Sequence, residues 1–259
     1  MYISLTPSDL AWAFGLIAIA IALSVWQKIG LEWQIAQAAG RTLIQLIMVG
    51  YILAIVFDPK GRNPFLVLAI ALIMITIATK VTRDRISQKI PRLGLLIWSS
   101  ILASATLSVG YTNFFILQPE PWYEPQYFIP LTGMIIGNAM NGGAIAGERL
   151  VSMINSQGLA IETYLSLGAT PAQAVANYRR EAVRASLIPT LNSMMVIGLV
   201  TLPGMITGQL LSGVAPLDAA SYQILLMFMI ALANLMTSLL VTAGLCQKFF
   251  NTEAQLLKF

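Results

Sequence analysis

Histidine is absent from this 259-residue sequence, and cysteine occurs only once, as Cys246. An intrachain disulfide and a metal site made of Cys and His side chains are therefore excluded. The sequence also lacks the G-x-x-x-x-G-K-[ST] loop that cradles nucleotide phosphates. We therefore expect a chain that is not an enzyme and that binds no cofactor itself.

Charge is scarce as well, because charged residues make up 10% of the chain and hydrophobic residues 57%. Charge-free runs longer than the roughly 18 residues of a transmembrane helix predict a polytopic membrane protein. The runs are rich in Leu, Ile, Ala and Met and lack the alternating polarity of a membrane barrel. The predicted fold class is an all-α transmembrane helical bundle, in one domain over residues 1–259, located in the cell (inner or plasma) membrane as a multi-pass protein.

Seven spans are predicted from the apolar runs. They are Leu10–Gln27, Ala36–Phe57, Pro64–Thr79, Leu93–Leu117, Tyr127–Gly147, Ser186–Leu211 and Ala219–Gln247. No Lys or Arg precedes the first span, so it lacks the basic segment of a cleaved signal peptide. We expect it to stay in the mature protein.

Basic residues are distributed unevenly between the predicted loops. With the N-terminus outside, 13 of the 15 Lys and Arg residues lie on the cytoplasmic side, and only Lys60 and Arg62 lie outside. The loop Lys80–Arg92 carries five of them, whereas Gln118–Gln126 carries none. The C-terminus and the polar insert at residues 157–189 are therefore predicted to be cytoplasmic. This asymmetry explains the pI near 9.3 without nucleic acid as a partner.

The polar insert is predicted to hold a short helix, a tight turn and a longer helix. Glu162–Leu167 is compatible with a helix, and Gly168–Ala169 suits a small C-terminal stop. Thr170 as N-cap, Pro171 at the first helical position and Gln173 three residues after the cap form a capping-box pattern. Such a turn fits a groove in a partner protein; the alternative is an amphipathic connector on the anionic lipid surface.

Several stretches resemble a known family. ETYLSLGA, in which Gly168 follows Glu162 by six residues, resembles the coupling-helix motif of ABC-transporter permeases. The stretches GNAMNGGAIAGERL (Gly137–Leu150) and LIPTLNSMMVIGLVTLPGMITGQLLSG (Leu187–Gly213) are similar to the FetB-type iron-export permeases of bacteria and the aluminium-tolerance permeases of plants. The resemblance covers essentially the whole chain.

This resemblance implies a permease subunit that forms a homodimer and binds two copies of a separate cytoplasmic ATPase, which would carry the ATP and Mg. It also implies export of iron, or of a related metal or its complex. The residues that it assigns to ATPase coupling are Glu162, Leu167, Gly168, Ala169, Thr170 and Pro171.

Polar side chains inside the spans are the first candidates for a substrate path. Asn138 and Asn141 lie in the fifth span among glycines that allow a neighbouring helix to approach closely. A buried amide needs a partner, so the two side chains either bind a neighbouring helix or face a water-filled path. Asn234, Thr237 and Ser238 give the seventh span a polar face, which is either an interhelical hydrogen-bond set or a pathway wall.

The sixth span supplies the remaining candidates. Pro203–Gly204 is expected to kink or unwind the helix. Most of the 12 methionines are expected to fill helix packing, but Met194, Met195 and Met205 share this span with Asn192 and the break. The metal ligands stay unknown, because the span interiors offer no carboxylate for a hard ion such as ferric iron.

Three alternatives stay open. The first is an ABC permease for an organic solute such as a nucleotide sugar. The second is an ATPase-independent channel or secondary transporter, against which the odd number of spans and the lack of intramembrane carboxylates argue. The third is a membrane scaffold whose insert recruits a soluble partner.

Overall fold

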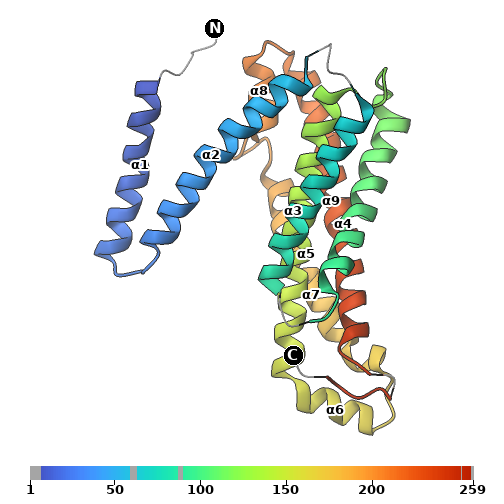
Figure 1. The fold of residues 1–259 in the computed structure, drawn as a ribbon. Helices are drawn as coiled ribbons and strands as arrows, with labels where there is room; N and C mark the ends of the chain where they lie inside the picture. The colour runs from blue at the N-terminus through green and yellow to red at the C-terminus, as the bar shows by residue number, and fades with distance from the viewer. Residues whose placement is uncertain (1–6, 59–62, 87–89, 252, 258–259) are drawn as a thin grey trace. The chain divides into compact units, whose positions relative to one another are not determined.

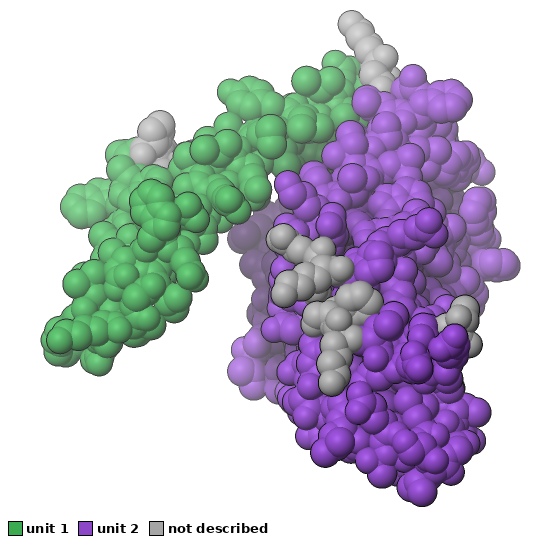
Figure 2. Space-filling model, turned by 60° about the horizontal axis from the view of Figure 1, so that its bottom comes forward, with its two compact units in different colours: residues 1–62 green, residues 63–259 purple. Residues whose placement is uncertain are grey.

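The protein is described by a computed structural model over residues 7–58, 63–86, 90–251 and 253–257. The regular secondary structure of these residues is helical, with no β-sheet, which confirms the predicted all-α class. The elements are α1 (Pro7–Trp26), α2 (Glu32–Val56), α3 (Pro64–Ile86), α4 (Leu93–Tyr111), η2 (Thr112–Leu117), α5 (Pro125–Ser156), α6 (Gly158–Ser166), α7 (Pro171–Val196), α8 (Gly204–Leu211) and α9 (Pro216–Lys248). The chain divides into two compact units, residues 1–62 and 63–259, which Figure 2 colours separately.

The first unit is a hairpin of the apolar helices α1 and α2. Lys28 takes the left-handed conformation, with φ at 53°, and so ends α1. The buried hydroxyl of Ser24 donates a hydrogen bond of 3.1 Å to the Glu32 carboxylate and joins the two helices beside the turn. Apolar side chains stay exposed on both helices, with Trp12 at 81%. Apolar surface of this extent needs contact with lipid or protein.

The second unit is a bundle of the long helices α3, α4, α5, α7 and α9 (Figure 1). Helices α3, α5 and α9 run in one direction, and α4 and α7 run in the other. Its core is apolar and includes Ile97, Ile135 and Leu245, each fully buried. Sparse hydroxyl pairs cross this core, such as Ser104 Oγ and Thr237 Oγ1, which are 2.6 Å apart. Burial of the apolar faces therefore positions the helices, and the polar contacts are concentrated at a few levels of the bundle.

Glycines on α5 bring this helix close to its neighbours, as the small-residue spacing predicted. A Cβ atom at Gly142 would overlap the Asn234 side chain of α9, and one at Gly147 would overlap Ile86 of α3. At Gly143 a Cβ atom would lie 3.0 Å from the Thr237 methyl group. The absence of a side chain at these positions lets α5 pack directly against α9 and α3.

The predicted sixth span, Ser186–Leu211, is not one helix. Helix α7 begins at Pro171 and ends at Val196, and the short helix α8 begins only at Gly204. Between them Gly198 takes a φ of +79°, and its amide donates a 2.9 Å hydrogen bond to the Thr201 carbonyl. Pro203 has no amide hydrogen to continue a helix and disfavours helical geometry in the residue before it. The chain is therefore unwound over residues 197–203 instead of being kinked at one point.

Helix α3 is longer than the predicted third span. It continues past Thr79 to Ile86, so that Lys80, Arg83 and Arg85 lie on a helix and not in a loop. Lys89 of the predicted loop lies outside the described residues, as do Lys60 and Arg62. The predicted span ends where the apolar run of the sequence ends, at Thr79. The helix continues to Ile86 because its last turns are still packed against the bundle.

Within the described residues, the helices long and apolar enough to cross a membrane are Glu32–Val56, Pro64–Ile86, Leu93–Leu117 and Pro216–Lys248. The apolar part of α1 is shorter, and the fifth predicted span lies inside α5. Several apolar helices of spanning length make this a multi-pass membrane protein. Seven crossings and the orientation of the termini stay predictions.

Basic side chains in the described part of the second unit gather at the end of the bundle that carries α6. They are Lys80, Arg83, Arg85, Arg92, Arg149, Arg179, Arg180, Arg184 and Lys248. The described loops at the other end, between η2 and α5 and between α7 and α9, contain no basic residue. We call the α6 side the basic end of the bundle.

Candidate functional site

The first candidate site is the α6–turn–α7 insert, which extends from the basic end of the bundle (Figure 1). Gly168 follows the end of α6 with a φ of +89°. Its amide donates to the Leu165 carbonyl, and the Ala169 amide donates to the Tyr164 carbonyl, each at 3.0 Å. This pair of hydrogen bonds is a Schellman motif, which terminates a helix and reverses the chain within two residues.

The predicted capping box at the start of α7 is confirmed. The Gln173 amide donates to Thr170 Oγ1 at 3.3 Å, and the Thr170 amide donates to Gln173 Oε1 at 2.9 Å. Pro171 occupies the first helical position, where its missing amide hydrogen costs nothing. The turn is therefore held by side chains and backbone within a few residues of each other.

Large apolar side chains are exposed on this insert. Leu159 and Leu167 are each 80% exposed, and Tyr164 is 53% exposed. Ile161 on the other face of α6 is fully buried and anchors the short helix to the bundle. Glu162 is exposed on the same short helix. An anchored, sharply defined turn with exposed apolar residues has the features of a docking surface for a protein partner.

The structure thus brings together the residues predicted to couple to an ATPase. Glu162 and Leu167 lie on or at the end of α6, Gly168–Ala169 forms the stop, and Thr170–Pro171 begins α7. Their contact with an ATPase stays a prediction.

The second candidate site is a half-open polar cavity of about 520 Å³ lined by α5, α7, α9 and the unwound segment 197–203. Its polar lining residues are Asn138, Asn141, Ser186, Thr190, Ser193, Thr201 and Asn234. Three of its lining residues also line an adjoining, more apolar cavity of about 410 Å³, namely Ile197, Pro203 and Met227. The unwound segment 197–203 therefore lies between the two cavities.

A hydrogen-bond network forms one wall of the polar cavity. The Asn234 amide group donates to Thr190 Oγ1 at 2.7 Å and accepts from Ser238 Oγ at 3.3 Å. Ser186 Oγ in turn donates to Ser238 Oγ at 2.8 Å. All four side chains are buried, so each needs these partners in the absence of water. The polar face predicted for the seventh span is therefore an interhelical hydrogen-bond set, and Asn234 also lines the cavity.

The other wall carries two amide side chains that make fewer hydrogen bonds to the protein. Asn138 donates to the Met134 carbonyl at 2.8 Å, within its own helix. Asn141 is exposed to the cavity and has no hydrogen-bond partner among the described residues. Both predicted asparagines therefore lie in the same cavity, with polar atoms available to a ligand or to water.

The sixth-span candidates do not come together. Asn192 is exposed and does not line the polar cavity, and Met195 is 68% exposed. Met194 lines the adjoining apolar cavity, and Met205 packs against the core. The structure therefore forms no methionine cluster from these residues.

Three residues of α7 were missing from the predicted substrate path. Ser186, Thr190 and Ser193 all line the polar cavity. Their spacing of four and three residues places them on one helical face, and this periodicity is visible in the sequence. The signal is weak because small hydroxyl side chains are common in membrane helices.

The polar cavity is electrically neutral. Its lining contains amides, hydroxyls and apolar side chains, with no carboxylate, guanidinium, ammonium or thiol. Among the described residues no group of three or more His, Cys, Asp or Glu side chains could hold a metal ion. The cavity therefore suits a ligand bound by hydrogen bonds and oxygen dipoles, and not a resident transition metal.

Comparison with known proteins identifies the family. Residues 7–250 match the sequence profile of the Uncharacterised protein family (UPF0014). The chain belongs to the UPF0014 family.

Relatives of this UPF0014 protein cover nearly its full length. It is 52% identical over 255 residues to the UPF0014 membrane protein slr1647 of Synechocystis sp., which covers 98% of both chains. It is 34% identical over 254 residues to the Probable iron export permease protein FetB of Escherichia coli, covering 98% of this chain and 95% of that protein. It is 32% identical over 244 residues to Protein ALUMINUM SENSITIVE 3 of Arabidopsis thaliana, covering 94% and 87%. These matches confirm the resemblance predicted from the sequence. No solved structure matches the UPF0014 chain.

Proposed function

We propose that this protein is the membrane subunit of an ABC transporter, and that a separate cytoplasmic ATPase drives it. In this proposal two copies of the chain form a homodimer and pass cargo across the membrane by alternating access. The cargo is iron, a related metal, or a complex of such a metal. The chain supplies the path and the docking surface, while the partner chain binds and hydrolyses ATP.

The α6–turn–α7 insert is the observation that carries this proposal. A transporter subunit without a nucleotide-binding loop needs a rigid surface through which a partner's motion reaches its helices. The Schellman motif at Gly168 and the capping box at Thr170 make the turn rigid, and α7 continues from it to the polar cavity. A displacement of the turn can therefore reach Ser186 and Thr190 along one helix.

The distribution of charge supports a cytoplasmic position for this insert. Basic side chains gather at the basic end, on the same side as α6, and the described loops of the opposite end lack them. Positively charged loops are retained on the cytoplasmic side during membrane insertion. An ATPase in the cytoplasm would thus meet Leu159, Tyr164 and Leu167 directly.

The cargo is inferred from relatives and from the polar cavity together. One relative is named a probable iron export permease. The cavity offers neutral oxygen atoms from amides, hydroxyls and backbone, which bind a hard cation only weakly. Weak binding is compatible with passage, and a metal that enters as a complex would use the same hydrogen-bonding groups.

A second candidate cargo is an organic solute such as a nucleotide sugar. The observation that favours it is the concentration of amides and hydroxyls in one cavity without any charged ligand for a metal. Sugar hydroxyls both donate and accept hydrogen bonds, as do the Asn, Ser and Thr side chains here. Transport assays that compare iron, other metals and sugars distinguish the two candidates.

The test of ATPase coupling is co-purification with a candidate ABC ATPase followed by ATPase assays in liposomes. We expect the wild-type chain to associate and to stimulate hydrolysis, and Gly168→Trp to abolish the stimulation. Gly213→Trp is the matched control, because Gly213 has a φ of +88° and ends α8 with the same hydrogen-bond pattern at the opposite end of the bundle. Absence of association, or equal effects of the two substitutions, would contradict the proposal.

A second pair of variants separates docking from folding. Leu167→Ser removes an exposed apolar side chain from the insert, and Leu217→Ser removes one of 83% exposure from the start of α9. We expect the first to weaken ATPase association and the second to leave it unchanged. If neither variant changes association, the exposed apolar residues of the insert are not the docking surface.

A further inference from the structure

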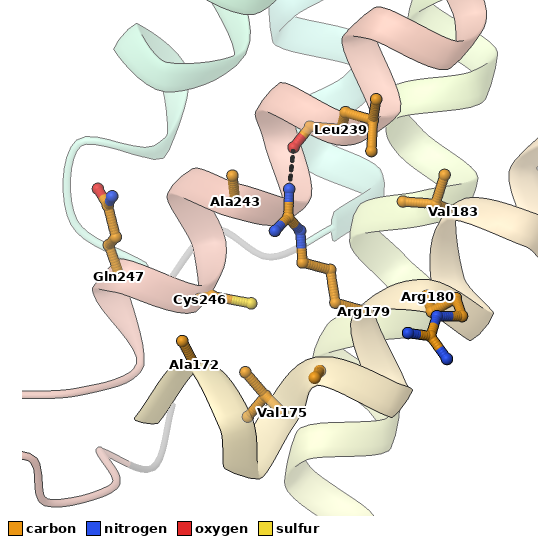
Figure 3. A pocket seen from close by; sticks show the side chains of 10 residues that line it. Ala172, Val175, Arg179, Arg180, Val183, Leu239, Ala243, Cys246 and Gln247 are labelled. Atoms are coloured by element: carbon orange, nitrogen blue, oxygen red, sulfur yellow. Dashed lines mark hydrogen bonds between the residues drawn. The ribbon is translucent and has the colours of Figure 1, made fainter. Parts of the chain in front are cut away.

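A hollow of about 520 Å³ lies between the first half of α7 and the last turns of α9, at the basic end (Figure 3). Its walls are mainly apolar and are formed by Ala172, Val175, Ala176, Val183, Leu239 and Ala243. Arg179 reaches across it from α7 towards α9, and Cys246 faces it from the last turn of α9. We call this hollow the α7–α9 groove. It is separate from the polar cavity and from the turn at Gly168.

Arg179 is positioned in the groove by neutral partners. Its Nη2 donates to the Leu239 carbonyl at 3.3 Å, and its Nε donates to Thr242 Oγ1 at 3.4 Å. A guanidinium group has five N–H donors, so the remaining ones are available. Arg180 is exposed beside it and also lines the groove.

Neither arginine has a carboxylate partner among the described residues. The contrast is Arg149, whose Nη2 is 2.6 Å from Glu181 Oε1. A half-buried guanidinium without a counter-ion favours an anion, and the planar donor fork suits phosphate oxygens in particular. The groove therefore combines an apolar wall with two cations that lack an internal counter-charge.

An exposed apolar surface continues from the groove towards the middle of the bundle. Phe228, Leu232 and Leu235 of α9 are all exposed. With Leu239 of the groove they follow one another at spacings of three or four residues, which places them on one side of α9. On α9, Leu235 lies one turn from Leu239 of the groove. A long hydrocarbon chain could lie along this surface while its polar end stays near the arginines.

We propose that the α7–α9 groove binds an anionic phospholipid. Its phosphate contacts the guanidinium groups of Arg179 and Arg180, and an acyl chain covers Leu239 and the apolar surface beyond it. A soluble anion would satisfy the arginines and leave the apolar wall in water. A neutral lipid would cover the wall and leave the cations without a counter-charge, so an anionic lipid matches both parts.

The single cysteine provides a direct measurement of occupancy. Cys246 lines the groove and is the only cysteine in the sequence, so any thiol label reports on this position alone. The experiment measures the rate at which N-ethylmaleimide modifies the purified full-length chain in nanodiscs. One set of discs contains phosphatidylcholine only, and the other contains phosphatidylglycerol in addition. We expect phosphatidylglycerol to slow the modification several-fold.

Variants of the arginines test the charge recognition. Loss of one charge-assisted hydrogen bond to phosphate corresponds to about a tenfold weaker interaction, so we expect Arg179→Gln to abolish the protection and Arg179→Lys to retain part of it. Arg184→Gln is the matched control, because Arg184 is an exposed arginine of the same helix that does not line the groove. Arg180→Gln serves as a second variant if Arg179→Gln fails to fold, and it should lower the protection by a smaller factor.

Several results would overturn the proposal. Equal protection by phosphatidylcholine would show that charge is not recognised. Equal protection by inorganic phosphate at millimolar concentration would identify a soluble anion as the ligand. Protection by a cytoplasmic ATPase with none from phosphatidylglycerol would assign the groove to a protein partner. Equal loss of protection in Arg184→Gln and Arg179→Gln would show that the groove arginines do not bind the lipid phosphate.

Discussion

The turn at Gly168 and the polar cavity around Asn234 are built in opposite ways. Every hydrogen bond that holds the turn joins residues within five positions of each other. The cavity wall instead depends on Asn234 and Thr190, which are 44 residues apart, and on Ser186 and Ser238, which are 52 apart. The turn is therefore specified by a short stretch of sequence, whereas the cavity exists only when three helices are assembled.

The two regions also differ in exposure, and this difference sets the energetic cost of damage. The capping groups at Thr170 are exposed, so water can replace a lost partner. The cavity network is buried, so a donor or acceptor left without a partner there destabilises the fold by its full desolvation free energy. Substitutions in the buried network of the cavity wall should therefore lower stability more than substitutions in the turn.

The largest effect is expected for Gly142→Ala. The new methyl group would overlap the Asn234 side chain, and overpacking of this kind costs about 1–3 kcal/mol. Gly137→Ala on the same helix is the control, because its Cβ atom meets nothing within 4 Å. Denaturant unfolding in detergent measures both. Equal stability of the two variants would mean that α5 and α9 are not packed as described.

A loss of similar size is expected for Asn234→Ala. It leaves the buried hydroxyl of Thr190 without its 2.7 Å partner, and such losses cost about 1–3 kcal/mol. Asn192→Ala removes an exposed amide from the neighbouring helix and should change the unfolding free energy by less than about 0.5 kcal/mol. If both variants unfold at the same denaturant concentration, the network contributes little to stability.

A local effect of about 1 kcal/mol is expected for Thr170→Ala, because it removes one half of the capping box. Hydrogen exchange should become faster at the first amides of α7 while the bundle core keeps its protection. Thr163→Ala is the control, since the Thr163 hydroxyl only bonds the Leu159 carbonyl within α6. A loss of protection throughout the bundle would show that the turn is not an independent local unit.

The smallest effect on stability, within about 0.5 kcal/mol, is expected for Asn141→Ala, because Asn141 is exposed to the cavity without a hydrogen-bond partner among the described residues. A clear loss in a transport assay with normal stability would link the cavity to the cargo. Asn192→Ala should transport normally. The reverse result, with Asn192 needed and Asn141 dispensable, would move the cargo path away from the cavity.

Sequence patterns located the turn better than the cavity. The order Gly168, Thr170, Pro171 and Gln173 was sufficient for the stop and the capping box, because each acts on its own backbone neighbours. Asn138 and Asn141 were recognised as candidates because amides are rare in apolar spans. Their companions on α7 were missed, since small hydroxyl side chains are common in membrane helices and carry a weak signal alone.

The sequence by itself determined the all-helical class, the apolar helices of spanning length and the capped turn. These properties depend on hydrophobicity and on interactions between near neighbours. Only the tertiary structure decided that Asn234 joins Thr190 across the bundle and that Arg179 reaches α9. These contacts join residues far apart in the chain, and they depend on which helix faces pack together, a choice that the pattern of one helix does not contain.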